Sequence, residues 1–408
     1  MMNSLFLIAV LEIVSPLRGT TVPVLTDSQR RFLDLPGEER RAAFADANRR
    51  RDMKAAGWYP ARIRLSWDGG TPPFAVVVAR QGGEGVLSTN VTLSAVEIDN
   101  LEIARWYRWT VTDARGEACG STFRTEDRAP RFLRIPGIPN TRDFGGRIGR
   151  DGRRIRQGLV YRTGGLNENA PCRFYSFSEL RRLYDEGRLA SHYRSVAASN
   201  AAVRLTRLFS EGKATADDAG PDFTVPGSFS PGATRVTDGN RDLLLKTLGI
   251  RTDIDLRSEE ECWGMTCSPL GPSVSWINVS SADYADMGLD WGKQAFARAF
   301  RLFLDESRYP ILFHCIAGQD RTGSLAFVLN GLLGVSEDEL YRDWEASGFC
   351  NDSPKLRHDL KFDRLVRTFD AFAGKDLNAR IEAYVRSCGI TEKEIGRFRE
   401  IMMEEKER

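Results

Sequence analysis

The sequence predicts an α/β domain with a mainly parallel central sheet flanked by helices, preceded by a small all-β sandwich. The first observation is a period-two alternation of apolar and polar residues between about residues 57 and 128, which is typical of antiparallel strands. The second is an alternation of short apolar runs with helical stretches after residue 129, which is typical of a parallel sheet. The third is the length of 408 residues, which favours two domains.

Residues 1–56 are predicted to form a leader and a helical segment. The apolar run Leu5–Val14 is similar to the core of an export signal, but no Lys or Arg precedes it and Glu12 interrupts it. A short buried strand or helix is therefore an equal alternative, and the run is too short to span a membrane as a helix. The stretch Thr26–Gln29 can cap a helix, and the charged run Glu38–Lys54 follows a Pro-Gly break.

Four alternating runs carry the prediction of a sandwich over residues 57–128: Ala61–Trp67, Phe74–Ala79, Trp106–Thr112 and Ser121–Thr125. Short strands at such spacing are typical of a small antiparallel sandwich. The residues Leu65-Ser-Trp67, Leu101, Tyr107-Arg-Trp109 and Phe123-Arg-Thr125 resemble a fibronectin type III domain. That resemblance implies a fold and no chemistry, so a spacer or docking module with an unknown partner is expected.

The α/β domain is predicted over residues 129–408, with an insertion at about 166–236. Its expected strands are Gly158–Tyr161, Arg251–Leu256, Val274–Val279 and Pro310–His314. The last part of the chain is expected to be helical, with a serine cap at Ser336 and a capping box formed by Thr391 and Glu394.

Charge and cysteine content exclude several classes of function. The formal net charge is +2, from 58 basic and 56 acidic residues, which gives no overall attraction to nucleic acid. The seven scattered cysteines do not indicate a disulfide framework. With only three histidines, a structural zinc site is not expected.

The stretch HCIAGQDRTG, residues 314–323, places a thiol after an apolar run and a guanidinium at the start of the next helical run. A thiolate at a helix N-terminus meets backbone N–H groups and the positive end of the helix dipole, so Cys315 is the predicted nucleophile. Amides in the curled loop can surround a tetrahedral dianion, and Gly318 allows the curl. The predicted phosphate-binding residues are Ile316, Ala317, Gly318, Gln319, Asp320 and Arg321.

Two neighbouring side chains complete a chemistry of covalent phosphoryl transfer. Arg321 presents a planar fork that can bind two phosphate oxygens, and Thr322 can donate a hydrogen bond to the sulfur of Cys315. The sulfur would attack phosphorus in line to form a phosphocysteine, an acid would protonate the departing oxygen, and water would release the enzyme. No metal ion or other cofactor is needed, because the amides and the guanidinium stabilise the charge.

The full motif resembles that of the bacterial branch of cysteine-based tyrosine phosphatases related to dual-specificity and lipid-acting enzymes. Asn140–Gly146 with Gly158–Thr163, and Leu248–Ser258, resemble further motifs of that branch in the same order. The resemblance covers about residues 129–350 apart from one insertion. It implies the cysteine-phosphatase fold and a protein-tyrosine or dual-specificity phosphatase, acting on a phosphorylated protein or a small phosphomonoester.

Two alternatives to a protein phosphatase remain. An inositol-phosphate or phosphoinositide phosphatase is less favoured, because Gln319 stands where the family frequently has a positively charged lysine. The alternative of another class is an inactive module that binds phosphorylated ligands. Inactive copies usually lose the cysteine or the arginine, whereas this chain keeps both Cys315 and Arg321.

The general acid is predicted among four carboxylates. Asp320 lies inside the loop, and Asp283 and Asp286 lie about 30 residues before Cys315, after an expected strand. Cysteine phosphatases carry a mobile acid loop at the position of Asp283, and the family resemblance makes Asp320 a candidate proton donor. Asp320 and Asp283 therefore rank first. Asp255 ends another expected strand and is alternatively the partner of an arginine.

Other polar residues are expected to support the site. Asn140, Arg142 and Asp143 are predicted to brace the loop, and His314 to form hydrogen bonds beside it without acting as a base. The arginines of the insertion could cover the pocket and select acidic substrates, or they could belong to a solvated helical hairpin: Arg173, Arg181, Arg182, Arg188 and Arg194. The apolar start and the sandwich favour export, phosphotyrosine signalling would favour the cytosol, and the prediction leans toward export.

Overall fold

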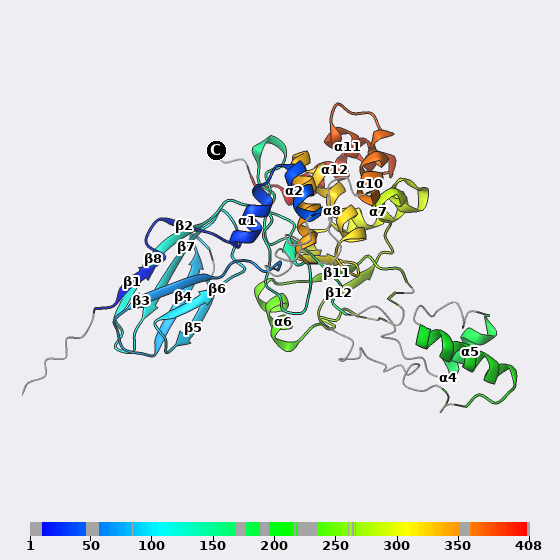
Figure 1. Ribbon diagram of the computed structural model, residues 1–408, viewed down its shortest axis with the longest axis horizontal. Helices are drawn as coiled ribbons and strands as arrows, with labels where there is room; N and C mark the ends of the chain where they lie inside the picture. The colour runs from blue at the N-terminus through cyan, green and yellow to red at the C-terminus, as the bar shows by residue number, and fades with distance from the viewer. Residues whose placement is uncertain are drawn as a thin grey trace, which may run out of the picture.

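The computed structural model describes residues 10–45, 57–83, 85–167, 177–187, 196–215, 235–259, 267–350 and 360–405, with residues 189, 218, 261, 262 and 265. The chain is mixed α/β, as predicted (Figure 1). Within these ranges the strands form three sheets, two toward the N-terminus and one of five strands in the α/β body.

The N-terminal sheets contain antiparallel strands and face each other across a common apolar cluster. The smaller has the order β1 (Glu12–Ser15), β3 (Ile63–Asp68), β6 (Ala95–Ile98). The larger has the order β2 (Thr20–Val22), β8 (Ala118–Thr125), β7 (Trp106–Thr112), β4 (Phe74–Arg80), β5 (Gly85–Val91). Strands β1 and β2 come from the segment expected as a leader, whose residues 1–9 lie outside the described residues.

Alternating burial explains why these residues form strands with one face inward. Along β3 the side chains of Ile63, Leu65 and Trp67 are buried, and the residues between them are not. The Trp67 ring packs edge-on against Phe74 of β4, with the ring centroids 5.2 Å apart. Removing such aromatic surface from water supplies most of the stabilisation of a small sandwich.

The sheet of the α/β body has the order β12 (Ser275–Asn278), β11 (Thr252–Asp255), β13 (Ile311–His314), β10 (Val160–Thr163), β9 (Arg142–Asp143). Neighbouring strands are parallel except for β9, which pairs antiparallel with β10. Every residue of β10, β11 and β13 is buried, as expected of strands covered on both faces.

Helices surround this sheet, and α8 (Asp320–Leu332) is buried along almost its whole length. The other helices of the body are α6 (Asp238–Asp242), α7 (Asp290–Leu302), α9 (Glu337–Ala346), α10 (Leu360–Asp370), α11 (Leu377–Ser387) and α12 (Glu392–Met402). Shorter helical turns are η1 (Arg150–Gly152), η5 (Leu243–Thr247), η6 (Tyr284–Gly288), η7 (Glu306–Arg308) and η8 (Ser347–Phe349).

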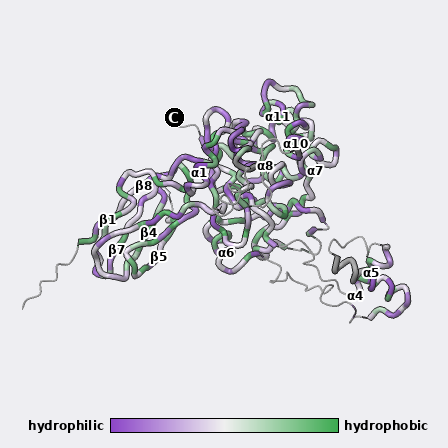
Figure 2. Tube along the Cα trace, in the orientation of Figure 1, coloured by the Kyte–Doolittle hydropathy of each residue, from purple (hydrophilic) through white to green (hydrophobic). Residues whose placement is uncertain are grey.

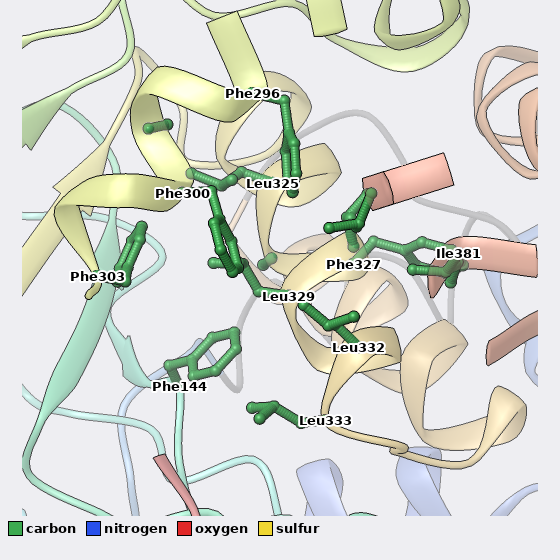
Figure 3. Packing of buried hydrophobic residues seen from close by; sticks show 14 of the residues in the cluster. Phe144, Phe296, Phe300, Phe303, Leu325, Phe327, Leu329, Leu332, Leu333 and Ile381 are labelled. Atoms are coloured by element: carbon green, nitrogen blue, oxygen red, sulfur yellow. The ribbon is translucent and has the colours of Figure 1, made fainter. Parts of the chain in front are cut away.

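Aromatic and aliphatic side chains lock α8 between its neighbours. Phe296 and Phe300 of α7 point toward Leu325 on one side of α8, and Ile381 of α11 approaches from the other side (Figure 3). A Cβ at Gly331 would lie 2.4 Å from Cδ1 of Ile381, so a larger residue there would force the Ile381 side chain to move. The helix that follows the thiol is therefore held in a fixed position.

The predicted helix caps are present. Thr26 and Gln29 form a capping box at α1 (Asp27–Asp34), the Ser336 hydroxyl accepts from the N–H of Glu339 at α9, and Thr391 with Glu394 forms a capping box at α12. Each such cap satisfies backbone N–H groups that the helix leaves unpaired.

The N-terminal module and the α/β body share one apolar cluster. Figure 1 shows α1 and α2 (Gly37–Ala45) between the sandwich and the α/β body. Phe349 of η8 packs against Phe32 of α1 and against Phe132, with centroid separations of 5.3 and 5.9 Å. The cluster that contains the sandwich core also includes Ala346 of α9.

The insertion contributes α4 (Phe177–Asp185) and α5 (Val196–Ser210), which pack around a small cluster of their own. Figure 1 draws this pair to one side of the α/β body. Arg181 and Arg182 face Asp185 and Glu186 of the same helical segment, which fits a solvated hairpin better than a lid. Arg173, Arg188 and Arg194 lie outside the described residues.

In the part of the chain that the structure describes, no helix has the length and apolarity needed to cross a membrane. Hydrophilic and hydrophobic residues are interspersed along the chain, the outer helices included (Figure 2).

Candidate active site

Three strand ends place the candidate site at one edge of the sheet. In the register, His314 at the end of β13 lies opposite Thr163 at the end of β10 and Asp255 at the end of β11. Cys315 follows directly and is 1% exposed, at the base of the loop that leads into α8. A topology in which parallel strands end together therefore gathers residues from three distant parts of the chain.

The loop from Cys315 to Gln319 curls tightly at Gly318. Its φ angle is +67°, and a Cβ there would lie 2.4 Å from the carbonyl oxygen of Thr163, so only glycine fits. Among the described residues, none of the N–H groups of residues 316–319 donates to another backbone group. A helix N-terminus with unpaired N–H groups favours an anion.

Asn140 braces this loop, as predicted. Its Nδ2 donates to the carbonyl oxygens of Gly318 at 2.8 Å and Ala317 at 3.2 Å. Asn140 itself has a φ of +58°, in the left-handed region that asparagine tolerates better than most residues. Arg142 supports it by donating to its Oδ1. The two side chains thus fix the outward-facing carbonyl groups of the loop.

Asp143 supports the segment before the loop. Its carboxylate accepts from the N–H groups of Gly145 and Gly158, both at 2.8 Å, and pairs with Arg131 at 2.7 Å. Asp143 is therefore architectural and holds β9 and β10, whereas the expected contact with the loop after Cys315 is not among its hydrogen bonds to the described residues.

A buried carboxylate on α9, Asp343, holds three arginines together. It accepts from Nε of Arg142 at 3.0 Å, from Nη2 of Arg147 at 2.8 Å and from Nη1 of Arg162. Burial opposes ionisation of Asp343, but Arg142 and its neighbours outweigh it and lower the pKa of this carboxyl strongly. One buried carboxylate therefore offsets part of the positive charge of a cluster that reaches the loop through Arg162, whose Nη2 donates to Gly318 O at 2.8 Å.

We expect Asp343→Asn to lower the free energy of unfolding by about 3–5 kcal/mol, because it leaves buried guanidinium groups without their carboxylate. Urea denaturation of the variant and the wild type measures this difference. The matched control is Glu97→Gln, which removes the partner of Arg62 in an exposed ion pair and should change stability by less than about 1 kcal/mol. Equal effects of the two substitutions would contradict the assignment.

Arg321 at the start of α8 faces Glu261. Its Nη1 and Nη2 lie 2.5 and 3.3 Å from the two carboxylate oxygens, and its side chain is 16% exposed. Burial lowers the pKa of Arg321, but the Glu261 carboxylate and the nearby Cys315 outweigh it and raise the pKa. The guanidinium is thus held near the thiol by an internal carboxylate.

Asp283 and Asp320 lie close enough to interact. Burial and the negative charge of Asp320 raise the pKa of Asp283, while Arg321 acts in the opposite direction. Tyr284 donates its hydroxyl hydrogen to Oδ1 of Asp320. The pair therefore contains one carboxyl, Asp283, whose protonated form is favoured by its surroundings.

Tyr284 ties the segment of Asp283 to α8. Its φ is +48°, a rare conformation for a bulky residue. Its N–H donates to Oγ of Ser324 at 3.0 Å, and its ring packs edge-on against Trp344 with the centroids 5.5 Å apart. Asp286 on the same turn is exposed.

Asp255 is the partner of an arginine, as its alternative interpretation predicted. Its carboxylate pairs with Arg257 at 2.6 Å in a fully buried contact. Burial alone would raise the pKa of Asp255, but His314 and Arg257 lower it well below its usual range. A carboxyl held ionised in this way is unsuited to donate a proton.

His314 lies behind the thiol. Its Nδ1 is 3.0 Å from the carbonyl oxygen of Cys315 and its Nε2 is 3.1 Å from Asp253. Burial lowers the pKa of His314, but Asp255 and Asp253 outweigh it and raise the pKa to about 9. A charged histidine here adds positive potential at the base of the loop.

The hydroxyl of Thr322 is buried and has no hydrogen-bond partner among the described residues, so the expected bond to the sulfur of Cys315 is not formed here. The side-chain nitrogen of Gln319 is likewise buried without a partner in that part of the chain. Within the same ranges, no group of three or more His, Cys, Asp or Glu side chains is placed to hold a metal ion.

The structure brings Cys315, Arg321, Asp320 and Asp283 together. It adds three residues that the sequence reasoning missed: Glu261, Tyr284 and Asp343. Glu261 ends a run of three glutamates, which by itself indicates a solvated surface. Tyr284 and Asp343 carry no local motif, so only their three-dimensional contacts reveal them.

A cysteine at the end of a central parallel strand, followed by a helix with an arginine in its first turn, is the arrangement of cysteine-based phosphatases. A model of the tyrosine phosphatase family matches residues 133–181 and 230–404, more than half of the chain. The chain belongs to the tyrosine phosphatase family and is a phosphatase.

Two curated relatives agree with this family. The Cupriavidus necator protein named "Putative tyrosine-protein phosphatase H16_A0669" is 27% identical over 254 residues, which cover 57% of this chain and 72% of that protein. A tyrosine-protein phosphatase of Nostoc commune is 28% identical over 142 residues, which cover 30% of this chain and 48% of that protein.

Among solved structures, the core catalytic domain of the PP-IP phosphatase SIW14 from S. cerevisiae matches 32% of this chain and 72% of its own. The sequence identity is 19% and the TM-score is 0.23, values too low to support a conclusion about this chain.

Proposed function

We propose that this phosphatase hydrolyses phosphomonoesters through a phosphocysteine intermediate and that its substrates are phosphotyrosine or dual-specificity sites in proteins. The observation that carries the proposal is the position of Cys315 at the base of a loop whose N–H groups at residues 316–319 donate to no backbone group among the described residues, with Arg321 beside it. Amides of residues 316–320 and the Arg321 fork bind the phosphoryl oxygens in this proposal.

The reaction proceeds in two steps. The sulfur of Cys315 attacks phosphorus while the bond from phosphorus to the departing oxygen breaks, and Asp283 gives that oxygen its proton. Water then attacks the phosphocysteine, Asp283 takes a proton from this water, and inorganic phosphate leaves with the thiolate restored. Asp320 supports the first step by its charge, because a neighbouring anion favours the protonated form of Asp283.

Arg321 must exchange partners during binding. Its fork pairs with Glu261, and a phosphoryl group with two negative charges competes for the same donors. The hydroxyl of Thr322, buried without a partner among the described residues, is available to the thiolate that departs in the second step.

The charge of the loop supports one substrate class over the other. Gln319 is buried at the start of α8 and is neutral, so it adds no positive charge for a second phosphate group. This supports phosphotyrosine over inositol phosphates and phosphoinositides. We also propose that the N-terminal sandwich is fibronectin type III-like, on the basis of its two packed sheets and the sequence resemblance.

A panel of substrates tests the proposal. Purified protein is given phosphotyrosyl, phosphoseryl and phosphothreonyl peptides, an inositol phosphate and phosphoinositide vesicles, each with and without orthovanadate. We expect vanadate-sensitive phosphate release that is fastest from phosphotyrosyl peptides. Faster release from the inositol substrates would assign the other substrate class, and tight binding without any release would identify a binding module.

A further inference from the structure

Arg40 of α2 is buried against a helix of the α/β body. The side chains of Arg40 and Glu345 are both fully buried, and Nε of Arg40 donates to the Glu345 carboxylate at 2.6 Å. Its Nη2 donates to Asp338 at 2.9 Å, and its Nη1 to the carbonyl oxygen of Leu35 at 2.5 Å. One guanidinium from the N-terminal module therefore holds α9 near both of its ends.

The opposite side of α9 holds the loop that follows Cys315. Asp343, two residues before Glu345, accepts from Nη1 of Arg162. The other terminal nitrogen of Arg162 donates to Gly318 O at 2.8 Å. Only one side chain thus separates α9 from the backbone of the loop.

The turn after α9 forms a second link. Oγ of Ser347 accepts from Nδ2 of Asn140 and from Nη2 of Arg142, both at 3.2 Å. Asn140 in turn donates to the carbonyl oxygens of Ala317 and Gly318. The segment from Asp343 to Ser347 is therefore attached to the loop on its inner side and to Arg40 on its outer side.

The direction of these carbonyl groups determines the anion site. A planar trans peptide points its N–H opposite to its C=O. When Asn140 and Arg162 hold the carbonyl groups of Ala317 and Gly318 outward, the N–H groups of Gly318 and Gln319 face the other way, into the loop. A shift of α9 would rotate these peptides and misalign the donors.

We propose that Arg40 is a positioning residue for the loop of residues 315–321 and acts through α9, so that the N-terminal module completes the catalytic site. Arg40 contacts no reacting atom. Its role is to hold Glu345 and Asp338, and through them the side chains that orient the loop. The expected effect on catalytic rate rests on the proposed function. The expected effect on the binding of an oxyanion such as tungstate does not, and it tests the inference independently.

The principal variant is Arg40→Met combined with Glu345→Gln. The single change would leave the Glu345 carboxylate buried and unpaired, which destabilises a fold strongly, whereas replacing both partners of a buried pair is often tolerated. Ser347→Ala is the second variant, because it removes only the hydroxyl on the inner side of the same segment. Arg62→Met is the matched control, since it removes an arginine from an exposed ion pair in the sandwich.

Two measurements are made on each folded variant: steady-state hydrolysis of p-nitrophenyl phosphate and the dissociation constant of tungstate by calorimetry. We expect both altered proteins to lose kcat and tungstate affinity by about tenfold or more, because small misplacements of catalytic groups have effects of that size. The control should match the wild type. Unfolding temperatures show whether any loss reflects only stability.

Wild-type kcat and tungstate affinity in the folded double variant would overturn the inference and leave the proposed function intact. A wild type that binds tungstate but releases no phosphate would overturn the proposed function. In that case, weaker tungstate binding by the folded double variant would still support the positioning role of Arg40.

Discussion

Cys315→Ser is expected to reduce hydrolysis of p-nitrophenyl phosphate by about 10⁴-fold or more, the size of effect seen when a covalent nucleophile is removed. A serine hydroxyl remains protonated at neutral pH, so it cannot replace a thiolate in the attack on phosphorus. The loop amides and Arg321 remain, however, and they are the groups proposed to bind the phosphoryl oxygens. We therefore expect tungstate to bind the variant with nearly unchanged affinity.

Initial rates and calorimetric titration check the two halves of this expectation. Cys119→Ser is the matched control, because Cys119 lies on β8 of the sandwich and should not affect the rate. A Cys315→Ser protein that keeps turnover within about tenfold of the wild type would remove the sulfur from the mechanism. Such a result would contradict the phosphocysteine intermediate.

Asp283→Asn is expected to lower kcat for a phosphotyrosyl peptide by about 10²–10³-fold, within the range that general acids contribute. The effect on p-nitrophenyl phosphate should be smaller, because p-nitrophenolate is a better leaving group that needs less help from an acid. Burial and the charge of Asp320 raise the pKa of Asp283, so its protonated form persists to higher pH. In the wild type, kcat should fall as the pH rises through this raised pKa, and Asp283→Asn should lose that decline.

Asp320→Asn tests whether the negative charge of Asp320 raises the pKa of Asp283. It removes a negative neighbour, so the pKa of Asp283 should fall and the decline of kcat should move to lower pH. Arg321, Asp286 and Lys361 also act on Asp283 and are unchanged in this variant. Asp290→Asn serves as the control, because it removes an exposed carboxylate at the start of α7. If the decline instead vanishes in Asp320→Asn and persists in Asp283→Asn, the general acid is Asp320.

The parts of the fold that depend on neighbouring residues could be predicted from the sequence. The strand β13, the glycine turn and α8 are contiguous, and their apolar run, Gly318 and helix start each carry a local signal. The strands β5 and β6 could not be predicted as readily. The edge strand β5 has no fully buried residue, so few of its positions need an apolar side chain, and β6 has only four residues.

The residues of the candidate site also fall into those that a local motif predicts and those that only the folded topology brings together. Cys315, Arg321 and Asp320 share one motif, and Asn140 belongs to a second motif that the sequence resemblance identified. Asp343 meets Arg142 across 201 positions of the chain, and Glu261 meets Arg321 across 60. Pairings over such separations depend on the whole topology, so single-sequence patterns do not contain them.

The apolar cluster between Phe32, Phe132 and Phe349 affects which partly unfolded forms the chain can populate. Opening the sandwich or detaching α1 would transfer these rings into water, and opening the α/β body would do the same from the other side. Local opening of either half therefore costs the free energy of exposing the same three rings to water. We therefore expect the N-terminal module and the α/β body to unfold together, although the matched family segment begins only at residue 133.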